Sequence, residues 1–151
     1  MKRKKTTKSD YILAYFGVIL IVAVGTAFIY ALGIFNPETW AKQEASGFPG
    51  FTVPDKGWEL KSDGTFTIIV QNSGYNINVT GITVTYGNVV KEKSVAVYLK
   101  PNTQATFIIQ DLGSPEKGSF YNISVEITYD NIDLELRGVR SFGTVTGRVT
   151  E

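Results

Sequence analysis

The sequence YILAYFGVILIVAVGTAFIYALGIF, residues Tyr11 to Phe35, contains twenty-five residues without a charged side chain. An apolar run of about 18 or more residues is typical of a membrane-spanning helix. At a rise of ~1.5 Å per residue, this run would reach roughly 37 Å as a helix. Within a bilayer, only a helix satisfies every backbone amide of a single crossing segment. The run therefore predicts a long N-terminal helix that lies in a membrane or packs in the core of an assembly.

The flanking charges predict an orientation for this helix. Residues 1–10, MKRKKTTKSD, carry five basic residues and one acidic residue, which gives +4, so the other residues carry −3 of the total charge of +1. Basic residues flanking a membrane helix stay on the cytoplasmic side, where they contact anionic lipid headgroups. We therefore expect a single-pass membrane protein with residues 1–10 as a cytoplasmic leader and the rest of the chain outside the cell. The mildly acidic outer part argues against a nucleic-acid partner.

Three interpretations of the apolar run remain open. Ala31-Leu32-Gly33 loosely fits a signal-peptide cleavage site, although the run is longer than a secretory signal and continues past this point. The run could also be a permanent anchor, or a helix that leaves the membrane to pack against copies of itself. Ala23, Ala27 and Ala31 recur every four residues and form a narrow stripe where a second helix could approach. Alanine is common in any membrane helix, so the stripe alone does not decide between the last two interpretations.

Several short motifs occur in an order typical of one family. They are DYILAYFGVILI (Asp10–Ile21), ALGIFNP (Ala31–Pro37), GFPGFTVPD (Gly47–Asp55) and SDGTFTIIVQN (Ser62–Asn72). In these segments the chain resembles archaeal type IV pilin-like and archaellin-like proteins with class III signal peptides. The resemblance implies a filament subunit, stored in the membrane and assembled through its N-terminal helix. It also implies a prepilin peptidase and pilus assembly machinery as partners.

The resemblance assigns roles to residues before the apolar run. It implies that Asp10 neutralises a positive charge in the assembly, which in the family is the new N-terminal amine of a neighbouring subunit. In an uncleaved chain, Lys8 or another basic leader residue would have to serve. The family pattern places the processing region at Lys5, Thr6 and Thr7. The chain departs from the pattern here, because the family usually has Gly or Ala before the scissile bond.

The segment after the apolar run reads as a connection. Asn36, Pro37 and Glu38 together form a helix-start signal, because proline lacks an amide that the first turn does not use. Residues 38–46 are interpreted either as a short helical stalk or as an irregular linker. Two glycines and two prolines in Gly47–Asp55 exclude a regular helix or interior strand there. The predicted division is a leader at 1–10, an apolar helix with its stalk at 11–46, and an outer domain at 47–151.

The outer domain shows alternating apolar residues and regular turn signals, which predict seven or eight short antiparallel strands. In Ser119–Tyr129 the alternation assigns Tyr121, Ile123 and Val125 to a core face. Asp130-Asn131 reads as a two-residue hairpin turn. The predicted fold is an immunoglobulin-like β-sandwich. Its predicted strands are Trp58–Lys61, Thr65–Gln71, Asn76–Tyr86, Ser94–Leu99, Gln104–Gln110, Ser119–Tyr129, Ile132–Gly138 and Ser141–Val149.

Few residues are candidates for chemistry. The chain has no cysteine and no histidine, which excludes thiolate chemistry, Ser-His-Asp triads and most zinc or haem sites. Asp130, Asn131, Asp133 and Glu135 carry oxygens that can bind calcium, but a solvated hairpin tip is the more economical interpretation. We therefore predict no catalytic residue, metal or cofactor, and no enzyme. Asn78-Val79-Thr80 and Asn122-Ile123-Ser124 match the N-glycosylation acceptor pattern, so Asn78 and Asn122 are candidate modification sites.

The predicted function is therefore structural. We expect a subunit of a type IV pilus-like or archaellum-like filament at the cell surface, with itself as the main partner, and the sequence leaves motility, adhesion and uptake open as its role. The alternative is a permanently anchored single-pass surface protein whose β-sandwich binds a partner or a glycan. The two differ in whether mature protein leaves the membrane.

Overall fold

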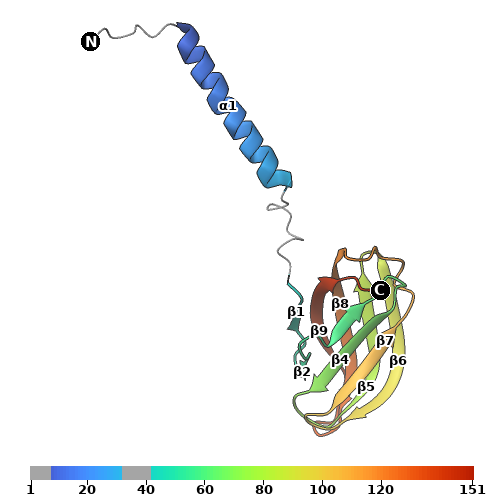
Figure 1. Ribbon diagram of the computed structural model, residues 1–151. Coiled ribbons are helices and arrows are strands. Elements are labelled where there is room, and N and C mark those ends of the chain that lie inside the picture. The colour runs from blue at the N-terminus through green and yellow to red at the C-terminus, as the bar shows by residue number, and fades with distance from the viewer. Residues whose placement is uncertain (1–7, 32–41) are drawn as a thin grey trace. The chain divides into compact units, whose positions relative to one another are not determined.

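The computed structural model describes residues 8–31 and 42–151 of the chain. The chain divides into two compact units, Met1–Trp40 and Ala41–Glu151. Within the described residues, the first unit contains the helix α1, Lys8–Ala31. The second unit contains all the strands of the described residues and holds the hydrophobic core. Figure 1 labels these elements along the chain.

The predicted fold class, a long apolar transmembrane or filament-core helix followed by an immunoglobulin-like sandwich, is wrong as stated. The helix α1 has 24 residues and takes in the polar residues Lys8, Ser9 and Asp10 at its start. Among the described residues, no helix combines the length and the apolarity that a membrane crossing needs. The prediction counted uncharged residues, whereas backbone hydrogen bonds define a helix, so α1 begins three residues before the apolar run. Residues 32–35 of the run lie outside the described residues.

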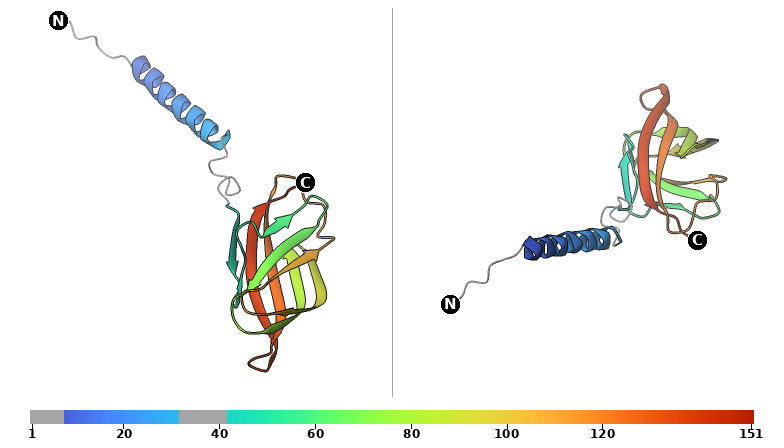
Figure 2. Two further views of the ribbon diagram at one scale, coloured as in Figure 1. Left: turned by 60° about the horizontal axis from the view of Figure 1, so that its bottom comes forward. Right: turned by 90° about the horizontal axis from the view of Figure 1, so that it is seen from above.

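The second unit is a β-sandwich. One sheet has the order β1-β9-β8-β5-β6, and in the other sheet β2 and β3 follow each other along one edge of β4 while β7 pairs with its other edge. All of these pairings are antiparallel. Figure 2 shows the two sheets packed against each other. The strands are β1 Glu44–Gly47, β2 Phe51–Thr52, β3 Trp58–Leu60, β4 Phe66–Asn72, β5 Ile77–Tyr86, β6 Val89–Leu99, β7 Gln104–Ile109, β8 Phe120–Asn131 and β9 Leu136–Arg148.

The core lies between the sheets and follows the alternation of the sequence. In β4, Phe66, Ile68 and Val70 are fully buried while the residues between them are partly exposed. In β8 the predicted core face is confirmed, because Tyr121, Ile123, Val125 and Ile127 are buried and their neighbours are not. Successive side chains of a strand point to opposite sides, so one polar and one apolar face result.

The connection into the sandwich differs from the prediction. Residues 44–46 form part of strand β1, which pairs with β9, so the helical interpretation of this stretch is wrong there. Local propensity does not reveal such pairing, because the partner strand lies about a hundred residues away, with Glu44 opposite Thr146. Phe48 and Phe51, which follow β1, are both buried in the core. Residues 38–41 of the predicted stalk lie outside the described residues.

Phe48 requires two unusual backbone positions. Its own φ is 62°, and its ring lies against Gly143 so closely that a Cβ there would be 2.3 Å from the ring. Its amide donates to the carbonyl of Phe142 at 2.8 Å. Glycine is therefore needed at position 143, because the ring of Phe48 occupies the space where a side chain of β9 would otherwise lie.

The predicted hairpin turn at Asp130-Asn131 is wrong. Strand β8 continues through Asn131, and a four-residue turn follows before Leu136, which is the partner of Asn131. The Asn131 side chain is buried, and its Oδ1 accepts a hydrogen bond from the Leu134 amide at 3.0 Å. Glu135 closes the turn with a φ of 55°. The side chain of Asn131 thus stabilises the turn although Asn131 itself belongs to strand β8. The two strands predicted after residue 131 are one strand, β9.

Candidate functional site

The surface of α1 is the largest apolar feature outside the sandwich core. Its side chains from Val18 to Val22 are all more than half exposed. Consecutive residues of a helix are about 100° apart around the axis, so these five residues occupy every side of the helix. The helix therefore has no polar face in this stretch and presents apolar side chains all round.

The predicted packing residues lie on this helix. Ala23, Ala27 and Ala31 are exposed, and their spacing of four places them along one side of α1. Asp10 lies in the first turn of the helix. The predicted processing residues Lys5, Thr6 and Thr7 lie outside the described residues. The structure thus brings the three alanines into one row.

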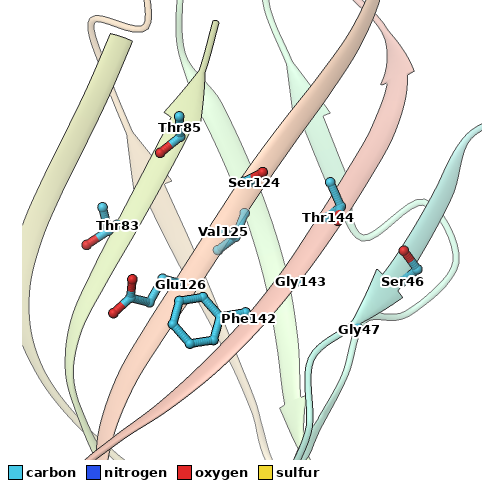
Figure 3. Close-up of a pocket in the computed structure, with 10 residues that line it drawn as sticks. All are labelled: Ser46, Gly47, Thr83, Thr85, Ser124, Val125, Glu126, Phe142, Gly143 and Thr144. Atoms are coloured by element: carbon cyan, nitrogen blue, oxygen red, sulfur yellow. The ribbon is translucent and has the colours of Figure 1, made fainter. Parts of the chain in front are cut away.

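On the sandwich, a shallow hollow of about 390 Å³ lies over the outer face of β1, β9, β8 and β5. Figure 3 shows the side chains that line it. Strand register aligns one row of hydroxyl groups across it, from Ser46 through Thr144 and Ser124 to Thr85. The next row places Glu126 opposite Phe142, whose ring is exposed.

The chemistry of this hollow is limited. The Glu126 carboxylate pairs with the Arg140 guanidinium at 3.3 Å, and Arg140 is largely exposed. The hydroxyl groups have no imidazole to activate them, because the chain contains no histidine. Within residues 8–31 and 42–151, no three acidic side chains gather in a way that could hold a metal ion. The hollow is a polar surface with one aromatic ring and carries no nucleophile paired with a base.

The two predicted glycosylation sites have different surroundings. Asn122 is exposed on the outer face of β8, opposite Thr146 of β9. Asn78 is half-buried on β5, where strand register places it between Tyr98 of β6 and Asp130 of β8. It lines a cavity of about 640 Å³ at the end of the sheet. Asn122 thus faces open solvent, whereas Asn78 is one of the residues that line a cavity.

Sequence reasoning treated Asp130–Glu135 as a solvated tip, and the structure shows it to be an ordered one. Both carboxylate oxygens of Asp133 accept hydrogen bonds from Asn76, at 2.8 Å from its amide and at 3.0 and 3.1 Å from its side chain. These bonds lower the pKa of Asp133 below its ordinary 3.8. The Tyr98 hydroxyl donates to Asn76 Oδ1 at 3.0 Å. Asn76 is the residue that sequence reasoning missed, since its partner Asp133 lies 57 residues away.

Two further groups in the sandwich have shifted pKa values. Burial raises the pKa of the Tyr121 hydroxyl to about 12, against a smaller opposing effect of a hydrogen bond to the backbone of Leu60. The pKa of Asp63 is lowered, chiefly by a hydrogen bond from the Thr65 amide at 2.8 Å. Both shifts belong to the packing of the sandwich and its turns.

Comparison with known proteins does not name a family. No protein-family model matches the chain, and no curated protein matches it at a significant level. The pilin-like and archaellin-like resemblance therefore stays a prediction from the motifs.

Proposed function

We propose that this chain is a structural subunit of a filament at the cell surface, in which subunits associate through α1 and carry the β-sandwich outside. The observation that carries this proposal is the exposed apolar surface of α1, in a chain whose sandwich buries its own core. Helices that are apolar on all sides are covered on all sides in their working state. Removal of apolar area from water contributes about 25 cal/mol per Å².

Copies of the same helix are the occupant that this surface fits best. An apolar side chain on every face allows several neighbours at once, and the row of Ala23, Ala27 and Ala31 lets one of them approach closely. Contacts between unlike faces of identical subunits produce open helical polymers when the rotation between subunits does not close a ring. The proposal needs only the α1 that the structure describes and does not require this helix to cross a membrane.

The motif resemblance supports the same function. It adds the expected partners, a prepilin peptidase and an assembly machinery, and a role for Asp10 as the partner of a positive charge in a neighbouring subunit. It also places the finished polymer outside the cell, with the membrane as the site from which subunits are drawn. These partners and this location are part of the proposal.

The test is to shear cells that express the full chain and to compare the sheared and membrane fractions. We expect filaments in the sheared fraction by electron microscopy, composed of this chain. Its intact mass there reports whether the leader has been removed. Full-length protein found only in membranes, with no filaments in the sheared fraction, would contradict the proposal and favour a permanent anchor.

A further inference from the structure

The cavity at the end of the five-stranded sheet combines an aromatic ring with several polar groups. Its volume of about 640 Å³ lies in the range of small-molecule sites. A row of side chains crosses its floor in strand register, from Tyr98 of β6 through Asn78 of β5 to Asp130 of β8. Arg137 of β9 and Glu135 of the β8–β9 turn complete the polar lining. The left view of Figure 2 shows the β8–β9 hairpin at this end of the sandwich.

We propose that this cavity binds one sugar ring of a saccharide. A pyranose has an apolar face of C–H groups, which packs against an aromatic ring, and a rim of hydroxyl groups, each able to donate and accept. Tyr98 supplies the ring, since its side chain is 53% exposed. The Asn78 amide both donates and accepts, the carboxylates of Asp130 and Glu135 accept, and the Arg137 guanidinium donates.

The charges of the cavity favour a neutral ligand. An anion would meet the carboxylates of Asp130 and Glu135, and a cation would meet the Arg137 guanidinium. A purely apolar ligand would displace water from these charged groups and offer no hydrogen bonds in return, which is costly for desolvated polar groups. A polyhydroxylated ring can pack against the Tyr98 ring and hydrogen-bond to the polar groups of the cavity, and it adds no charge.

The binding groups are held in place before any ligand arrives. The Tyr98 hydroxyl donates to Asn76 Oδ1 at 3.0 Å, and Asn76 is held by Asp133 of the turn. Asp130 Oδ1 accepts a hydrogen bond from the Gly138 amide at 2.8 Å. A ring and a carboxylate fixed in this way lose little conformational freedom on binding, and this improves affinity.

The sugar can come from two sources. Asn78 itself carries an acceptor pattern, Asn78-Val79-Thr80, so a glycan attached there would begin inside the cavity. The other source is a saccharide on a different molecule. Both sources present the same chemistry to Tyr98. They are distinguished by comparing sugar binding by protein from a host without N-glycosylation with that by protein from a glycosylating host.

The first experiment uses the full chain, produced in a host without N-glycosylation and dispersed in a detergent without a sugar headgroup. Glucose, galactose, mannose and N-acetylglucosamine are titrated against it by NMR, with sorbitol as an open-chain control. We expect saturable binding of at least one ring sugar, with a dissociation constant on the order of 1 mM, and none of sorbitol. Absence of saturable binding by all four sugars up to roughly 50 mM overturns the proposal.

Variants locate the binding. We expect Tyr98→Ala to weaken it roughly fivefold or more, and Tyr98→Phe, which keeps the ring, to change it by less than about threefold. Tyr75→Ala is the matched control, because Tyr75 is 52% exposed at the same end of the sandwich but lines a different cavity. The Tyr98→Phe variant keeps the test decisive if the alanine variant fails to fold. Equal losses in Tyr98→Ala and Tyr75→Ala would overturn the assignment to this cavity.

The second arm separates the two sources. Wild-type chain from a glycosylating host is compared with Thr80→Val, which removes the acceptor pattern and leaves Asn78 in place. If only Thr80→Val binds added sugar, the attached glycan occupies the cavity; if both bind equally, the ligand belongs to another molecule. Because the measurement uses dispersed chains, failure here leaves the filament proposal intact, and failure to form filaments leaves this site intact.

Discussion

Helix α1 and strand β4 use similar apolar residues with opposite results. In β4, Ile68 and Val70 are fully buried between the sheets, whereas in α1 Ile19 and Ile21 are exposed for 65% and 71% of their area. In β4 buried residues alternate with partly exposed ones, so the strand has one face toward the core and one toward water. In α1 the residues from Val18 to Val24 are apolar without interruption. An alternating segment can bury its apolar face within its own domain, while a uniformly apolar helix needs neighbours on every side.

The largest expected effect tests whether α1 contacts copies of itself. We expect Ala27→Leu to abolish or shorten filaments, because overpacking of a close contact costs about 1–3 kcal/mol and every subunit repeats it. Ala96→Leu is the matched control, since Ala96 is exposed on β6 of the sandwich. Filament length is measured by electron microscopy, and thermal melting of the sandwich should not change. Filaments of normal length in the Ala27→Leu variant would show that this side of α1 has no close neighbour.

A smaller effect on assembly is expected at Asp10. If its carboxylate neutralises a positive charge of a neighbouring subunit, Asp10→Asn weakens a charge-assisted contact and lowers the filament yield. Expression level and melting of the sandwich should stay as in the wild-type chain. The yield is measured as filament protein in the sheared fraction. An unchanged yield would remove Asp10 from the assembly contacts and weaken the pilin-like interpretation.

In the sandwich, a loss of stability is expected at Gly143. An alanine Cβ would lie 2.3 Å from the ring of Phe48, which is itself buried. We expect Gly143→Ala to lower the free energy of unfolding by about 1–3 kcal/mol. Gly74→Ala is the control, because a Cβ there meets no atom within 4 Å. Urea unfolding measures both, and equal stability of the two variants would mean that Phe48 can move aside at little cost.

The smallest effect concerns pH. Because hydrogen bonds from Asn76 lower the pKa of Asp133 below 3.8, this carboxylate stabilises the fold above that pH. The contribution is lost as the pH falls through the lowered pKa, when the folded protein must also bind the proton. We expect the melting temperature to fall less steeply below pH 3.8 in Asp133→Asn than in wild-type chain. Asp63, whose pKa is also lowered, contributes in the same direction and remains in both proteins.

An unchanged acid dependence in Asp133→Asn would contradict this assignment. Asp55→Asn, at an exposed position in another loop, is the control for the general effect of removing one carboxylate. The acid dependence of the melting temperature reports on the sandwich and not on α1, because Asp133 and Asn76 both lie in the sandwich.

Much of the sandwich could be predicted from local pattern. The core face of β8 is confirmed. The end of β8 could not be predicted, because Asn131 looks like a turn residue and is buried inside a strand. Asparagine is favoured in turns for the hydrogen bonds of its side chain, and here it makes such a bond to Leu134 from the last strand position.

The sequence by itself determined which segments are apolar and which strand faces turn inward, because these follow from the order of residues and the two-residue period of a strand. Only the tertiary structure decided that residues 44–47 join β9, that Gly143 must make room for Phe48, and that Tyr98, Asn78 and Asp130 share one cavity. These relations join residues that lie 20 to about 100 positions apart in the chain. They arise from strand register and packing, which depend on how the whole sandwich closes around its core.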